Sequence, residues 1–97
     1  MRPPVFPRAA AADVEDAVRW YEAQRDGLGD EFLETVRATL EAIRLRPQSA
    51  PIVHRDMRRQ LLRRFPCGLF YRIVENQVVV LACFHAKRSP RVWCARG

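Results

Sequence analysis

Hydrophobic residues recur with a helical period in the first half of the chain. Over residues 9–25 and again over residues 30–46, apolar side chains return every three to four positions, which places them on one face of a helix. The sequence Gly-Leu-Gly at residues 27–29 separates the two segments, and so short a connection predicts an antiparallel helical hairpin. We expect Asp30 to cap the second helix and Pro47 to end it, because aspartate accepts hydrogen bonds from free helical N–H groups and proline has no N–H to donate.

The second half of the chain changes to strand-like patterns. Three segments have strand length and are rich in β-forming residues: 57–65, 69–74 and 77–84. The connections between them are short and predict an antiparallel meander. The nearly continuous apolar run at residues 78–84 predicts a central strand covered on both faces, whereas the arginines among the leucines of residues 57–65 predict an edge strand. Residues 48–56 are expected to form a loop, and the proline-rich residues 1–7 at most a short strand.

These elements predict an α+β fold in a single domain that spans residues 1–97. A helical hairpin would pack on a small, mainly antiparallel sheet, with a short N-terminal strand and a short C-terminal tail. A chain of 97 residues is too short to divide between two hydrophobic cores. Because no apolar run approaches the ~20 residues of a membrane span and the start does not resemble a signal peptide, we expect a cytoplasmic protein without membrane contact.

Charge is distributed unevenly along the chain. Residues 1–41 carry five arginines and nine acids, for a net charge of −4, whereas residues 42–97 carry twelve basic residues and two acids, for a net charge of +10. Sixteen of the 17 basic residues are arginine, whose planar guanidinium suits phosphate and carboxylate groups. The basic C-terminal part is therefore expected to attract a polyanion or an acidic protein.

Most of the candidate chemistry follows the last predicted strand. His85 ends this strand and could exchange a proton near neutral pH, as a nuclease base must, with nearby cations to stabilise phosphorane charge. The alternative is a histidine whose ring hydrogen-bonds the backbone at the end of the sheet. The candidates for contact with a macromolecular target are Arg59, Arg64, His85, Lys87, Arg88, Arg91 and Trp93. If the protein is a nuclease, the catalytic candidates are His85, Arg59, Arg64 and Arg88.

The aromatic residues leave two alternatives open. Trp93 either folds back onto the core or serves as an anchor for a target. Trp20 and Tyr21 are adjacent in the first helix, so only one of them can face the core and the other is left for the hairpin or a partner.

The sequence predicts no disulfide, metal or cofactor. The three cysteines, Cys67, Cys83 and Cys94, are odd in number and form no C-x-x-C pair. The chain also lacks a phosphate-binding glycine loop and a carboxylate pair with metal-ligand spacing.

Read in order, several short motifs resemble one family. They are Ala-x-x-Asp-Val at 10–14, Trp-Tyr-Glu at 20–22, Leu-Gly-x-x-Phe-Leu at 28–33, Pro47, Arg-Phe-Pro at 64–66, Phe-Tyr-Arg-Ile at 70–73 and His-x-x-Arg-x-Pro-x-x-Trp at 85–93. Together they resemble the RelE/ParE superfamily, the toxins of bacterial type II toxin–antitoxin systems. The resemblance implies a helical hairpin on a small sheet, and a cognate antitoxin that is acidic and folds onto the toxin in a hetero-oligomer.

The resemblance also bears on the target. RelE-like toxins cleave mRNA on the ribosome with basic residues on the second and third strands and a C-terminal aromatic residue. Arg59 matches one basic position, but Leu61 and Gly68 stand where other charged residues are required, and Trp93 has no hydroxyl. ParE-like members, known as plasmid stabilisation proteins, inhibit DNA gyrase without known catalytic residues, and many carry His-x-x-Arg after the last strand, as residues 85–88 do here.

The ParE-like alternative is therefore favoured, with growth arrest through gyrase by a non-enzymatic inhibitor. Two alternatives stay open: a ribosome-dependent mRNA endoribonuclease, and a non-toxic basic interaction module. Cys67 replaces the tyrosine that often follows Phe-Pro in the family.

Overall fold

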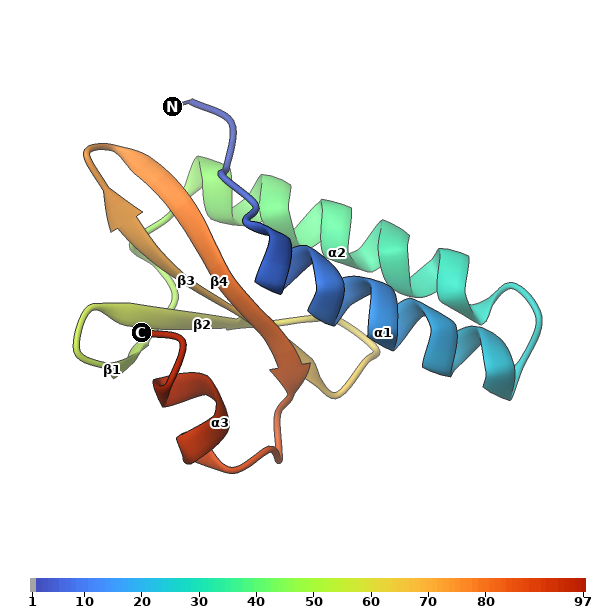
Figure 1. Ribbon diagram of the computed structural model, residues 1–97. Helices are drawn as coiled ribbons and strands as arrows, with labels where there is room; N and C mark the ends of the chain where they lie inside the picture. The colour runs from blue at the N-terminus through green and yellow to red at the C-terminus, as the bar shows by residue number, and fades with distance from the viewer. Residues whose placement is uncertain (1) are drawn as a thin grey trace.

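A helical hairpin covers one face of a four-stranded antiparallel sheet, and a short third helix lies on the other face (Figure 1). The computed structural model describes residues 2–97. In chain order the elements are α1 (Arg8–Gln24), α2 (Leu28–Leu45), β1 (Ile52–His54), β2 (Met57–Leu61), β3 (Cys67–Val74), β4 (Gln77–His85) and α3 (Pro90–Cys94). The strands follow one another in the sheet as β1-β2-β3-β4. This architecture confirms the predicted α+β fold.

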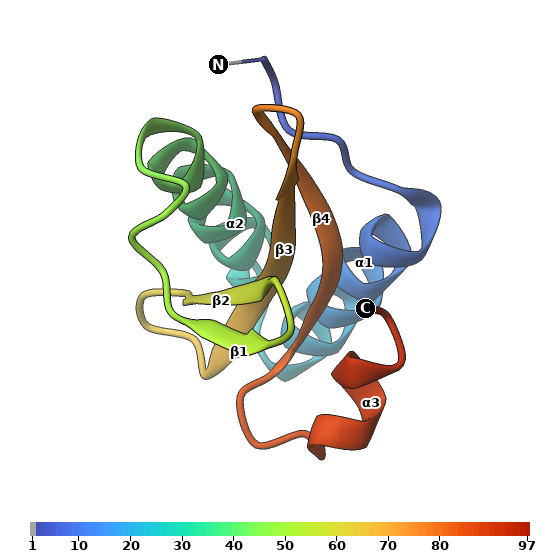
Figure 2. The ribbon, with the colours of Figure 1, turned by 90° about the vertical axis from the view of Figure 1, so that its left-hand side faces the viewer.

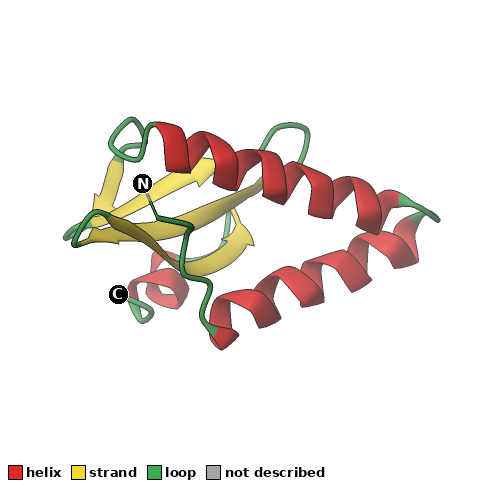
Figure 3. Ribbon diagram, turned by 90° about the horizontal axis from the view of Figure 1, so that it is seen from above, coloured by secondary structure: helices red, strands yellow, loops and turns green. Residues whose placement is uncertain are grey.

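The connection between α1 and α2 replaces the cap that the sequence predicted. Gly27 has a φ of 87° in the left-handed region, and α2 begins at Leu28 instead of after Asp30. The Glu22 carboxylate of α1 accepts hydrogen bonds from the N–H groups of Gly27 (3.0 Å) and Gly29 (2.9 Å). The prediction of Asp30 as the cap is therefore wrong, because a carboxylate from the preceding helix already binds these N–H groups. Seen from above, the two helices converge at this connection and diverge toward the sheet (Figure 3).

The strand prediction had the right order but missed β1 and misplaced β2. Residues 52–54, which were expected in a loop, pair with β2 through Ile52↔Arg58 and His54↔Met57. β2 thus lies between β1 and β3 and is not an edge strand, contrary to the prediction. It also ends at Leu61, four residues early, as the chain turns through Arg64 with a φ of 68°.

β4 is the last strand of the sheet, not a central one. Beyond it lies a parallel bridge at Val5, whose N–H donates to the Val78 carbonyl (2.8 Å) and whose carbonyl accepts from the Val80 N–H (2.9 Å). Figure 2 shows this N-terminal segment passing beside the β3–β4 end before it enters α1. The predicted N-terminal strand is therefore a single bridge, and Met1 lies outside the described residues.

Side chains bind the edge of β4 beyond Val5. The Cys83 N–H donates to Asp13 of α1 (3.1 Å), and the Arg96 guanidinium donates to the Leu81 carbonyl (3.1 Å). The strand is apolar because α1 covers one face while the α3 side covers the other, where Ala82 is fully buried. β4 is thus covered on both faces, as predicted, although it lies at the end of the strand order and not in the centre of the sheet.

The sheet separates two hydrophobic clusters. On the helical side, the largest buried residues are Phe32, Ile43, Leu69, Tyr71, Val78 and Val80. On the other side, Met57, Phe70, Ala82 and Trp93 form a smaller cluster.

Trp93 stacks on Phe70 with ring centroids 5.0 Å apart and is 7% exposed, so it folds back onto the core. Tyr21 stacks on Phe32, whereas the Trp20 side chain is left outside, 60% exposed.

Within residues 2–97, no helix combines the length and apolarity needed to cross a membrane.

Candidate functional site: a basic turn and two hollows

Four polar side chains cluster where the chain leaves β4 and enters α3. We call them the basic turn: His85, Lys87, Arg88 and Arg91. All four are exposed, and none forms an ion pair with a carboxylate of the described chain. The turn therefore presents positive charge that the rest of the described molecule does not neutralise.

The local sequence fixes the shape of the basic turn. His85 accepts a hydrogen bond at Nδ1 from the Lys87 N–H (3.0 Å), which corresponds to the backbone-capping alternative considered for this histidine. Ser89 then caps α3, its hydroxyl accepting from the Arg91 N–H (3.3 Å), and Pro90 occupies the first turn. The short helix that follows was not predicted from the sequence, which gave a tail.

Two guanidinium groups lie against Phe84, the residue before the basic turn. Arg88 and Arg96 each lie 5.0 Å from the centroid of the Phe84 ring. Arg96 also forms two hydrogen bonds to the Asp13 carboxylate (2.9 and 3.0 Å), whereas Arg88 has the aromatic contact alone among the described residues. Arg96 therefore ties the C-terminal segment to α1, while Arg88 is available to a partner.

Arg59 occupies the middle of β2 on the face that α3 covers. It is half-buried, its guanidinium lies 6.0 Å from the Phe70 ring centroid, and its Nε is buried without a hydrogen-bond partner in residues 2–97. Gly68 on β3 makes room for it, because a Cβ there would lie 3.0 Å from the Arg59 Cγ. This contact gives a steric reason for glycine at the position where a RelE-like nuclease would require a charged residue.

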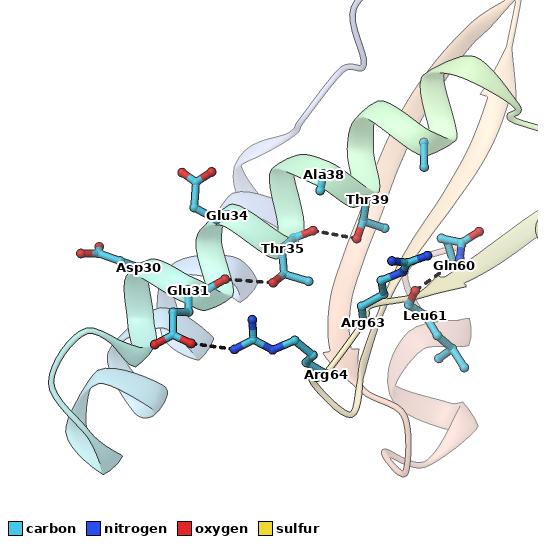
Figure 4. Close-up of a pocket in the computed structure, with 11 residues that line it drawn as sticks. Asp30, Glu31, Glu34, Thr35, Ala38, Thr39, Gln60, Leu61, Arg63 and Arg64 are labelled. Atoms are coloured by element: carbon cyan, nitrogen blue, oxygen red, sulfur yellow. Dashed lines mark hydrogen bonds and ion pairs between the residues drawn. The ribbon is translucent and has the colours of Figure 1, made fainter.

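Arg64 lies on the other side of the molecule's sheet, toward α2. Its guanidinium pairs with the Glu31 carboxylate at 2.6 Å (Figure 4). The same carboxylate also binds Arg25 at 3.0 Å. Hydrogen bonds from Arg25 and, to a smaller extent, from Arg64 hold the pKa of the Glu31 carboxyl below its usual value. Arg64 is thus already paired within the chain.

Two separate hollows flank these residues. The first, of about 670 Å³, lies between α2 and the end of β2, and Arg64 lines it beside a row of small α2 residues that includes Thr35, Ala38 and Thr39 (Figure 4). The second, of about 500 Å³, lies between α1 and the end of β4, and we call it the α1–β4 hollow. His85 and Arg88 line this second hollow.

The structure brings only some of the predicted contact residues together. His85 and Arg88 share the α1–β4 hollow, but Arg64 lines the other one and Arg59 lies half-buried on β2. Trp93 cannot contact a target in this conformation because it is buried against Phe70. The local sequence could not show this separation, because it carries no information about which face of the folded sheet each turn approaches.

The cysteines are free thiols in apolar surroundings. The Tyr21 hydroxyl lies 3.6 Å from the Cys67 sulfur. Burial raises the pKa of the Cys67 thiol and raises that of Cys83 to about 12. Both thiols are therefore neutral at physiological pH and are not reactive nucleophiles. His, Cys, Asp and Glu side chains of the described chain form no group of three that could hold a metal ion.

Sequence reasoning missed Asp13, Phe84 and Arg96 as parts of this region. Asp13 and Arg96 are 83 positions apart, so no local pattern relates them. Trp20 did carry a signal, because its adjacency to Tyr21 required one of the two to face outward.

Comparisons with known proteins agree with this geometry. A sequence model of the ParE toxin family, described as the ParE toxin of the type II toxin–antitoxin system parDE, matches residues 5–90. A solved structure titled "Chromosomal ParDE TA system from P. aeruginosa" shares the fold with a TM-score of 0.64 and 20% sequence identity, over 88% of this chain and 96% of that chain. No curated protein matches the chain significantly. The resemblance predicted from the sequence is confirmed, and the chain belongs to the ParE toxin family of type II toxin–antitoxin systems.

Proposed function

We propose that this protein arrests bacterial growth by binding DNA gyrase, and that a cognate antitoxin neutralises it. The observation that carries the proposal is the basic turn, an exposed group of basic side chains with no carboxylate partner in residues 2–97, on a chain of the ParE family. An inhibitor that acts by binding needs such a surface and no catalytic group. Because gyrase works in the bacterial cytoplasm, the proposal places the toxin there.

The geometry favours this function over the endoribonuclease. RNA cleavage requires a base and cations that converge on one phosphate within hydrogen-bond reach. Of the four catalytic candidates, only His85 and Arg88 line one hollow, while Arg64 is bound to Glu31 and Arg59 is half-buried beside Phe70. The nuclease set is therefore incomplete around His85, the candidate base.

Charge also supports the expected antitoxin chemistry. An acidic segment would be drawn to the basic C-terminal half by long-range attraction and would order as it binds. Association should then be fast and should weaken as salt rises. The toxin and antitoxin would form a hetero-oligomer.

A supercoiling assay with purified gyrase tests the proposed target. Adding the toxin should stop gyrase from supercoiling relaxed plasmid. Toxin that has first been mixed with antitoxin should leave gyrase active. The charge reversal Lys87→Glu with Arg91→Glu should weaken inhibition, because it removes free cations from the basic turn. Arg46→Glu, an exposed reversal at the end of α2, is the matched control and should leave inhibition unchanged. Full gyrase activity in excess toxin would show that the target assignment is wrong.

Translated mRNA provides the test of the endoribonuclease. We expect no codon-positioned cuts in a ribosome-dependent cleavage assay. Cuts that disappear in His85→Ala, with the circular dichroism spectrum unchanged, would replace gyrase inhibition with nuclease activity. Normal growth during strong expression without antitoxin would instead favour the non-toxic basic module.

A further inference from the structure

The α1–β4 hollow has a shape and a lining suited to binding a partner, and the proposed function gives it no role so far. Its volume of about 500 Å³ is enough for one large side chain. Its walls come from α1 on one side and from β4 and the start of β3 on the other, so rigid elements shape it. No described segment of the chain fills it.

The part of the lining that we call the floor consists of the buried Cys67 and Cys83 and the half-buried Ala17 and Tyr21 of α1. Asp13 also lines the hollow with a side chain that is 10% exposed, but its charge is balanced by the ion pair with Arg96. The Tyr21 hydroxyl finds its partner in the Cys67 sulfur, and burial keeps both thiols protonated. Such a floor stabilises an apolar group and gives little to a charged one.

Trp20 forms part of the wall and remains 60% exposed. Its ring meets Tyr21 edge to face, with centroids 5.0 Å apart, so the indole is held beside the opening. An exposed tryptophan next to an apolar hollow is the arrangement that commonly anchors protein interfaces, because the ring buries a large area at low entropic cost.

The free charge at the opening is positive. Asp13 is bound by Arg96 and by the Cys83 N–H, and Asp16 pairs with Arg19. Arg88 lies over Phe84 with no carboxylate partner among residues 2–97. A partner that brings its own carboxylate next to an apolar side chain would complement both the floor and Arg88.

Nucleic acid fits this place less well. A base could stack on Trp20, but the phosphates beside it would approach the carboxylates of Asp13 and Asp16, which line the same hollow. A protein segment can place a single carboxylate at Arg88, whereas a nucleic acid brings a phosphate with every nucleotide.

We infer that the α1–β4 hollow receives an apolar side chain of the toxin's protein target, flanked by an Asp or Glu that binds Arg88. This inference rests on the proposed function, since it names the part of the target that the toxin grips. The indole of Trp20 closes over the inserted side chain, and the carboxylate fixes its orientation.

A matched set of small probes tests the hollow without gyrase. Indole-3-acetate carries an aromatic ring and a carboxylate, tryptamine carries the same ring and an ammonium, and adenosine monophosphate carries a base and a phosphate. In ¹H–¹⁵N NMR titrations we expect indole-3-acetate to give saturable shifts at the Trp20 indole N–H and at residues 84–88, and to bind more tightly than the other two. Equal or tighter binding of tryptamine, preference for the nucleotide, or no saturable shift at these residues would overturn the inference.

Filling the hollow from within provides the matched variants. Ala17→Phe places a ring over the floor, and Ala23→Phe places the same ring on the exposed part of α1 outside the hollow. Ala17→Phe should abolish the indole-3-acetate shifts, while Ala23→Phe should leave them unchanged. The same result from both variants, with both folded by circular dichroism, would contradict the proposed site.

Gyrase then tests whether the target uses the hollow. Trp20→Ala and Ala17→Phe should each weaken gyrase binding about tenfold or more in surface plasmon resonance. Leu45→Ala, which shortens another apolar residue that is 65% exposed, should not. If gyrase binds all four proteins equally, the proposed contact is wrong although the target is right. If gyrase does not bind the unmodified toxin, the target is wrong, and the probe titration still decides the hollow's chemistry.

Discussion

At the scale of single residues, the same residue type has opposite roles in this chain. Trp93 is buried against Phe70 beneath α3, whereas Trp20 is exposed beside the α1–β4 hollow. Arginine shows the same division, since Arg64 and Arg96 are bound by carboxylates and Arg88 is not. Counting basic or aromatic residues therefore overstates the surface available to a partner.

The two tryptophans give a direct test at this scale. Trp93→Ala should lower the free energy of unfolding by about 3–5 kcal/mol, because it empties a packed cluster. Trp20→Ala should change it by less than about 1 kcal/mol, because that ring is mostly in water already. Urea denaturation followed by circular dichroism measures both. Similar losses in the two variants would contradict the burial that the structure assigns to them.

At the scale of elements, side-chain contacts between elements set where α2 begins and how α1 is held. Glu22 of α1 binds the first N–H groups of α2, and Asp13 of α1 binds both β4 and the C-terminal segment. α1 is thus connected by one carboxylate at each end to a different part of the fold.

The close approach of the two helices can be tested at Gly29. A Cβ at this position would lie 2.9 Å from the Val18 carbonyl oxygen, so Gly29→Ala should destabilise the protein by about 1–3 kcal/mol through strain in the helix contact. Gly27→Ala meets no atom within 4 Å but must adopt a φ of 87°, and should cost about 1 kcal/mol. Thermal or urea unfolding compares the two. A neutral or stabilising Gly29→Ala would show that the helices do not pack this closely.

The Asp13–Arg96 pair should couple α1 to the C-terminal segment. Asp13 is 10% exposed at its side chain and Arg96 is 30% exposed, so the pair is partly shielded from water. Asp13→Ala should cost about 2–3 kcal/mol, because it removes the ion pair and leaves the Cys83 N–H without its acceptor. The loss should be somewhat smaller than for a fully buried pair, because this pair is partly exposed. A double-mutant cycle with Arg96→Ala should give a coupling of about 1–2 kcal/mol. Strict additivity of the two substitutions would contradict a direct pair.

At the scale of the whole molecule, the sheet divides apolar clusters of unequal size, and the chain separates its charges. The helical hairpin carries most of the acids, several of them paired with arginines of the same helix, while the C-terminal half carries the unpaired basic turn. The sheet contains the buried thiols of Cys67 and Cys83 and the buried phenol of Tyr71, and burial raises the pKa of each. Stability should therefore respond to alkaline pH.

Stability should fall as pH rises above about 8.5, where thiols of the unfolded chain begin to ionise. The pKa of Cys83 is raised from 9.0 to about 12 in the fold, and that of Cys67 is also raised, so over this window the unfolded state binds fewer protons than the native state. The slope should approach ~1.4 kcal/mol per pH unit for Cys83, and Cys67 should steepen it further. Urea midpoints between pH 7 and 10 under reducing conditions measure it, and Cys83→Ala should give a shallower decline. An identical slope in that variant would rule out Cys83 as a cause.

The sequence by itself determined the type and order of the main elements, because helical and strand periods are local properties of residues such as those at 30–46 and 78–84. The motifs spread along the chain also determined the family, which the match over residues 5–90 confirms. β1 escaped prediction because three residues held only by their pairing with β2 carry no period of their own.

Only the tertiary structure decided which polar groups meet. It paired Asp13 with Arg96 and Arg64 with Glu31, buried Trp93, and left Arg88 and Trp20 beside one hollow. These outcomes depend on contacts between residues far apart in the chain, and such contacts arise from how the elements pack in three dimensions, which the local spacing of residues does not encode.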